Sequence, residues 1–172
     1  MKRLTLLRHA DANAARLDQA DAERPLSARG RSEASAQARA LAEADFQVDL
    51  VLCSPARRAR ETQEALRAAS ARPWPARFPE PLYLATPTTL LATLQDLPDA
   101  LSAVLVVGHN PGLHELARTL AGSTAPEAAV RASQVLSTGT LMRLRCDVAR
   151  WSELAPACAR LCRVVKPGER IA

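Results

Sequence analysis

Three short segments constrain the fold more than any other feature, because each joins an apolar, strand-length run to an Arg or a His. They are residues 4–9, 51–58 and 104–109. The first begins with Leu and Thr residues and ends on Arg8 and His9, a run that predicts a buried strand. Ligands of open α/β sheets bind at the carboxyl edge of the strands. We therefore expect His9 to lie in a pocket that the other two segments complete.

The length and composition indicate a single domain spanning residues 1–172. A chain of 172 residues can bury a substantial core without disulfides or metals. Hydrophobic residues make up 48% and charged residues 24%, which argues against disorder and against membrane spanning. The net charge of +5 comes from arginines interspersed with acidic residues, and aromatics are only 3% of the chain, so stacking platforms are few. We expect neither a nucleic acid nor a membrane as a partner.

The N-terminus and the cysteines predict a cytoplasmic protein with free thiols. Charge returns at Arg8 before a hydrophobic region of signal-peptide length develops. The four cysteines are an even set, but the chain is not a small secreted one. Cys158 and Cys162 lack the two-residue spacer of zinc-binding pairs and have no His beside them. We therefore expect no metal site there.

Four short motifs predict where helices begin. Each has a capping side chain, and in three of them proline follows, where its missing N–H costs nothing. The motifs are Ser27, Ser54-Pro55, Thr86-Pro87 and Asn110-Pro111. We expect the first helix to end near residue 44, the second near residue 71 and the last at Gly122. Ser54 is expected to act mainly as a cap.

The remaining segments predict strands. Residues 48–53 and 102–107 are apolar and of strand length, and one brief extended piece is expected at 80–84. From residue 133 onward the pattern becomes alternating, and residues 142–146 and 160–165 predict an antiparallel pair. Strands alternating with helices predict an α/β fold: a three-layer α/β/α sandwich whose central sheet is mainly parallel with an antiparallel edge.

Four side chains are then expected at the carboxyl edge of the sheet or at the helix starts beside it. They are Arg8, His9, Arg58 and His109. Two guanidiniums and two imidazoles without clustered carboxylates favour a phosphate pocket over a metal site, because the planar Arg fork holds two phosphate oxygens at once. Helix N-termini add N–H donors for an anion. His114, one helical turn further on, is expected at the surface.

The chain resembles the histidine phosphatase superfamily (branch 1), whose fold is phosphoglycerate mutase-like. The resemblance begins with Leu6-Leu7-Arg8-His9-Ala10 and continues, in order, through residues 24–30, 54–62, 106–113 and 136–140. The superfamily usually has Gly after the Arg-His pair. Ala10, followed by Asp11-Ala12, is the form typical of the SixA-type phosphohistidine phosphatases.

The resemblance implies a role for each matching residue. His9 would attack phosphorus and carry a covalent phosphohistidine, which water would then hydrolyse without a metal or cofactor. Arg8 and Arg58 would hold the phosphoryl oxygens, and His109 would help neutralise their charge. Arg58, rather than Arg57, matches the family position counted from Ser54-Pro55. Neighbouring arginines would lower the pKa of His9 and favour its nucleophilic form.

One departure from the family bears on the substrate. Many branches use a carboxylate as general acid for an alcohol leaving group, and this sequence offers only Glu80 and Asp96 by position. The departure suits a leaving group that is easily protonated, such as the imidazole of a phosphohistidine. We expect a monomer acting on a phosphohistidine-bearing signalling or phosphotransfer protein. The alternatives are a small-molecule phosphomonoesterase on the same fold and a non-catalytic phosphate-binding module.

Overall fold

A six-stranded sheet forms the middle layer of the computed structural model, which describes residues 1–70, 74–122 and 136–170. The strand order is β3-β2-β4-β1-β5-β6. β3, β2, β4 and β1 pair in parallel, and β5 and β6 add an antiparallel edge. The strands are β1 (Lys2–Arg8), β2 (Leu50–Cys53), β3 (Ala76–Arg77), β4 (Ala103–Gly108), β5 (Leu141–Cys146) and β6 (Ala159–Val165). The predicted sheet, parallel with an antiparallel edge, is confirmed.

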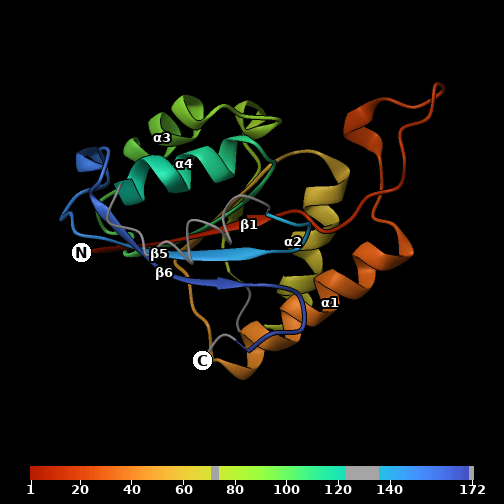
Figure 1. Cartoon of the computed structure of the whole chain (residues 1–172), viewed down its shortest axis with the longest axis horizontal. Coiled ribbons are helices and arrows are strands. Elements are labelled where there is room, and N and C mark those ends of the chain that lie inside the picture. The colour runs from red at the N-terminus through yellow and green to blue at the C-terminus, as the bar shows by residue number, and fades with distance from the viewer. Residues whose placement is uncertain (71–73, 123–135, 171–172) are drawn as a thin grey trace.

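Helices cover both faces of the sheet, as the prediction of three layers requires (Figure 1). One layer consists of α1 (Ala28–Glu43) and α2 (Arg57–Ala69), and the other of α3 (Pro87–Gln95) and α4 (Gly112–Ala121). In the described part of the chain, short 3-10 helices lie at Asp21–Glu23, Glu80–Leu82 and Trp151–Glu153. Within the described ranges, no helix is both long enough and apolar enough to cross a bilayer.

Strand β1 is central because its sequence is apolar towards both helix layers. Leu4 and Leu6 pack into the cluster under α3 and α4, and Leu7 packs into the cluster under α1 and α2. All three are fully buried, and each contributes roughly 1.5–3 kcal/mol to stability through burial. An uninterrupted apolar run of this kind is typical of a strand covered on both faces. The carboxyl end of β1 is thereby fixed in the middle of the sheet edge.

The predicted helix starts are confirmed at two motifs and wrong at two. Ser27 Oγ accepts from Gly30 N–H, and Thr86 Oγ1 accepts from Thr89 N–H, as N-caps do. Helix α2 instead begins two residues later than expected, at Arg57, and helix α4 one residue later, at Gly112. Their predicted caps are Ser54 and Asn110, whose side chains make tertiary hydrogen bonds. Neither side chain bonds an N–H within the helix, although Ser54 also accepts from Ala56, the residue just before α2.

The segment between α2 and α3 also differs from the prediction. The expected extended piece at residues 80–84 is a 3-10 helix, Glu80–Leu82, and the short strand lies earlier, at Ala76–Arg77. Leu82 is buried in the core under α3 and α4, so this turn is fixed by packing. The expected end of α2 near residue 71 lies outside the described residues, which show the helix to Ala69.

Gly30 sits where helix α1 meets the segment after β1. A Cβ at this position would lie 1.8 Å from the backbone oxygen of Asp11. We predict that Gly30→Ala destabilises the protein by about 1–3 kcal/mol, because the backbone of one element must move. Ser32→Ala is the matched control on an exposed face of the same helix, and it should change stability by less than about 0.5 kcal/mol. Urea unfolding measures both, and equal stabilities would contradict the close contact.

Candidate active site

The carboxyl ends of β1 and β4 place two imidazoles side by side. Arg8 ends β1 and lies opposite Gly108, which ends β4, in the parallel register. The N–H of His9 donates to the Gly108 carbonyl over 3.0 Å, which extends the ladder by one residue. His9 and His109 are therefore neighbours, with ring centroids 5.0 Å apart in an edge-to-face arrangement.

Arg58 joins the two imidazoles from the first turn of α2. Its side chain is only 4% exposed. Its Nε donates to Nε2 of His9 over 3.3 Å, and its Nη2 lies 3.5 Å from Nδ1 of His109. The neighbouring Arg57 instead forms an exposed ion pair with Glu61. The structure thus brings Arg58, and not Arg57, to the histidines.

Arg8 contributes a second guanidinium to the same edge. Its Nη1 donates to the carbonyl of Leu136, which also accepts from the Asn110 amide. Its Nε is buried and has no hydrogen-bond partner among the described residues. Its charge lowers the pKa values of His9 and His109, though less than burial does. Arg8 therefore brings positive charge and an unused donor to the two rings.

The hydrogen bonds of His9 define its tautomer. Nδ1 lies 2.7 Å from the carbonyl oxygen of Ala10, and because a carbonyl only accepts, Nδ1 carries the proton. Nε2 is then the nitrogen with the lone pair, and it accepts from Arg58. The N–H of Ala10 donates to Thr62 Oγ1 on α2, which fixes this turn. The sequence left open which nitrogen could attack, and the backbone geometry selects Nε2.

Burial keeps both rings neutral. Burial lowers the pKa of His9 to about 4, and the charges of Arg58, Arg8 and Arg24 act in the same direction against the Ala10 hydrogen bond. Burial likewise lowers the pKa of His109 to about 3, with further contributions from His9 and Arg58. A neutral imidazole with an open Nε2 is a base and a nucleophile at neutral pH.

Ser54 is a residue of the site that the sequence analysis assigned to helix capping. Its side chain is fully buried, and its Oγ lies 2.7 Å from Nε2 of His109. The same oxygen also accepts from the N–H of Ala56. Because a guanidinium only donates, Nδ1 of His109 accepts from Arg58 Nη2, and the ring proton lies on Nε2, which donates to Ser54 Oγ. The Ser54-Pro55 motif drew attention to this residue in the sequence, but it indicated a helix cap and not a partner of His109.

Asp21 is the carboxylate that contacts the site, and the sequence analysis did not single it out. Its Oδ2 accepts from Arg58 Nη2 over 3.0 Å and from the Tyr83 hydroxyl over 2.6 Å. Its Oδ1 accepts from Arg24 over 2.8 Å, and its carbonyl accepts from Arg58 Nη1 over 2.7 Å. These bonds, first that of Tyr83, hold the pKa of Asp21 well below its usual range. The only signal in the sequence was a long polar loop after the first strand.

The two carboxylates chosen by position lie elsewhere. Glu80 is exposed in the 3-10 helix Glu80–Leu82, and Asp96 is exposed at the end of α3. Neither makes a hydrogen bond or ion pair with the predicted site residues, namely Arg8, His9, Arg58 and His109. His114 is half-exposed on α4 and also makes no hydrogen bond with these side chains.

Comparison with known proteins places the chain in a family. The family model of the histidine phosphatase superfamily (branch 1) matches residues 4–77. An uncharacterized protein from Mycobacterium tuberculosis is 38% identical over 144 residues, which is 83% of this chain and 88% of that protein.

Solved structures agree with the family match. A protein from Nakamurella multipartitia assigned as the phosphohistidine phosphatase SixA is 30% identical, with a TM-score of 0.82 over 98% of this chain and 97% of its own. A counterpart from Agrobacterium tumefaciens with the same assignment is 26% identical, with a TM-score of 0.81 over 96% and 98% of the two chains. The chain belongs to the histidine phosphatase superfamily, which supports phosphatase activity.

The buried histidines predict a defined pH dependence. Folding lowers the pKa of His9 to about 4, whereas a histidine in the unfolded chain has a pKa of about 6.5. Between pH ~4 and pH ~6.5 the unfolded chain therefore binds more protons than the folded protein. Stability is therefore full above pH ~6.5 and falls as the pH is lowered towards 4. Histidine ring NMR across this range should show His9 as the neutral Nδ1–H tautomer at pH 6, with His114 as an internal reference. A His9 ring that takes up its proton near pH 6.5 would contradict the buried geometry.

Proposed function

We propose that this protein hydrolyses phosphohistidine in a partner protein through a covalent phosphohistidine on Nε2 of His9. The observation that carries the proposal is the lone pair of that nitrogen, which faces the Arg58 guanidinium at 3.3 Å beside a second, neutral imidazole. The site thus combines a nucleophile with positive charge for the phosphoryl oxygens and with a second polar ring. This set matches phosphoryl transfer, in which positioning and electrostatics supply most of the rate.

The reaction has two balanced steps. In the first, Nε2 of His9 bonds to phosphorus as the bond from phosphorus to the leaving nitrogen breaks, and that nitrogen takes a proton from water. In the second, water attacks the phosphorus, the bond to Nε2 breaks, and phosphate leaves with His9 restored. The proton that the attacking water releases neutralises the hydroxide left by the first step. The hydrogen bond from Nδ1 to the Ala10 carbonyl keeps the ring oriented throughout both steps.

The cationic and polar side chains around His9 would stabilise the charge on the phosphoryl oxygens. Arg58 and Arg8 supply positive charge and N–H donors, including the unpartnered Nε of Arg8. His109, whose Nδ1 accepts from Arg58 Nη2, would help to orient that guanidinium towards these oxygens. Because these groups are held before substrate arrives, little reorganisation is needed during the reaction.

The state of Asp21 favours a substrate whose leaving group needs no acid. Its pKa is lowered by Tyr83, Arg24 and Arg58, so the carboxylate is ionised at neutral pH and cannot donate a proton. An alkoxide leaving group needs such a donor, whereas an imidazole, with a pKa of about 6.5, is readily protonated near neutrality. The likeness to the two SixA-assigned structures supports the same substrate class, and we infer that Asp21 positions Arg58.

A substrate panel tests the proposal. We expect turnover of a phosphohistidine protein to exceed that of sugar phosphates, because Asp21, the carboxylate that contacts the site among the described residues, is ionised at neutral pH. His9→Ala should abolish turnover with the fold retained, and His114→Ala, on the exposed side of α4, should match the parent. Base-stable, acid-labile phosphate should be trapped on His9 of the parent. A clear preference for sugar phosphates would show that the protein is a small-molecule phosphatase instead. The absence of any turnover would contradict the proposal and favour a non-catalytic phosphate-binding module.

Asp21→Asn tests the positioning of Arg58. An amide cannot form the ion pairs with Arg58 and Arg24, so Arg58 should be less well placed and kcat should fall about tenfold. Asp18→Asn is the matched control, because this loop carboxylate forms only an exposed pair with Arg16. Steady-state kinetics against pH should show a lower plateau with an unshifted profile. An increase in kcat would mean that Asp21 competes with the substrate for Arg58.

A further inference from the structure

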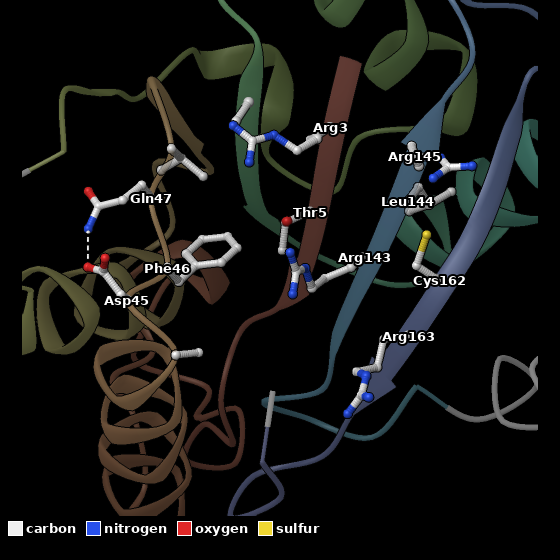
Figure 2. Close-up of a pocket in the computed structure, with 13 residues that line it drawn as sticks. Arg3, Thr5, Asp45, Phe46, Gln47, Arg143, Leu144, Arg145, Cys162 and Arg163 are labelled. Atoms are coloured by element: carbon white, nitrogen blue, oxygen red, sulfur yellow. Dashed lines mark hydrogen bonds between the residues drawn. The ribbon is translucent and has the colours of Figure 1, made fainter. Parts of the chain in front are cut away.

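A second basic hollow lies on the α1 and α2 face of the sheet, where α1 has already ended. The groove has a volume of about 510 Å³. Strands β1, β5 and β6 form its floor, and residues 44–48 form the facing wall. Figure 2 shows its most evident feature, four arginines on the strand side, with Phe46 opposite. The four are Arg3, Arg143, Arg145 and Arg163.

These arginines occupy positions that elsewhere on this face are apolar. Side chains on a strand alternate between faces, so Arg3 shares its face with Leu7, which packs under α1 and α2. On β5, Arg143 and Arg145 share the face of Leu141, which packs in the same cluster. The register places Arg3 beside Arg145, and Arg143 beside Arg163. The layer of α1 and α2 does not cover this end of the sheet, and arginines occupy its positions in place of leucines.

The register also divides the arginines into two pairs. Arg145 lies two positions after Arg143 on β5, a distance of roughly 7 Å along the strand. A register shift between β5 and β6 at Arg143 and Leu144 leaves Cys162 as an extra residue on β6, and such bulges re-aim nearby side chains. The groove therefore presents two guanidinium pairs at a spacing that a chain of about three phosphates spans.

The positive charge of the groove is largely uncompensated. The side chains of Arg3 and Arg163 make no hydrogen bond or ion pair with any described residue. Arg143 lies over the Phe46 ring at 5.6 Å, and Arg145 has only a loose pair with Asp147 at 3.9 Å. The one carboxylate in the lining, Asp45, accepts a hydrogen bond from Gln47. Gathering four like charges costs repulsion, which an anionic ligand would relieve.

We infer that this groove binds a small molecule carrying a chain of two or more phosphate groups. Arginine holds phosphate through two parallel N–H donors, and the two pairs can hold separate phosphates. The volume is in the range of small-molecule sites, and Phe46 and Val48 supply an apolar wall for the remainder of the ligand. Arg3 and Arg8 are five residues apart on β1, roughly 17 Å, so this site is separate from that of His9 and independent of the proposed function.

Inorganic tripolyphosphate is the probe that tests the site. Calorimetry is done in the Arg58→Ala background, which weakens phosphate binding at the other end of β1. Arg3→Gln combined with Arg163→Gln should weaken tripolyphosphate binding at least tenfold. The fold should be unaffected, since neither side chain has a partner among the described residues. Arg67→Gln with Arg118→Gln removes the same charge from exposed positions on α2 and α4, and should change the Kd less than twofold.

Cys162 provides a readout confined to the groove. It is exposed in the groove lining, so bound tripolyphosphate should slow its alkylation by iodoacetamide. Cys158, half-exposed and outside the groove lining, should react at an unchanged rate. The proposed site would be wrong if both double variants lost tripolyphosphate binding equally, or if the Arg58→Ala background protein bound no tripolyphosphate. A glutamate-rich peptide that protects Cys162 better than tripolyphosphate would overturn the ligand class in favour of an acidic protein partner.

Discussion

Strands β1 and β4 lie side by side in the middle of the sheet, and their parallel register decides where the reactive groups meet. The leucines of β1 and all residues of β4 are buried, so a shift by one residue would move every leucine and valine to the opposite layer. The hydrogen bond from the N–H of His9 to the Gly108 carbonyl follows directly after the paired residues of β1 and β4. The hydrophobic core therefore holds His9 and His109 in place, although neither ring belongs to it.

The core also sets the electrostatics of the site. Burial disfavours a charged imidazole, and three nearby arginines disfavour it further, so His9 remains a neutral base. Concentrated positive charge would itself be costly, and Asp21 offsets part of it by pairing with Arg58 and Arg24. The loop that carries Asp21 is thus part of the proposed active site at the carboxyl edge of the sheet. An anionic substrate meets side chains that are already oriented.

Basic groups lie near both ends of strand β1, for different reasons. At its carboxyl end, the half-buried Arg8 and the buried Arg58 are hydrogen-bonded and lie near His9. Towards the amino end of β1, Arg3 lies beside an open groove whose other arginines come from β5 and β6. The positive net charge of the chain is therefore not evenly spread over its surface. Part of it lies in two defined places, each suited to phosphate by the geometry of the guanidinium.

The sequence by itself determined the layer order, the buried strand that ends at Arg8 and His9, and the identity of Arg8, His9, Arg58 and His109 as neighbours. Apolar runs, caps and prolines are local signals, and strand ends in a parallel sheet meet at one edge whatever the details of packing. Only the tertiary structure decided the roles of Ser54 and Asp21, the tautomer of His9 and the arginine groove. Each depends on partners distant in the sequence, and a hydrogen bond to such a partner overrides the local preference for capping or solvent.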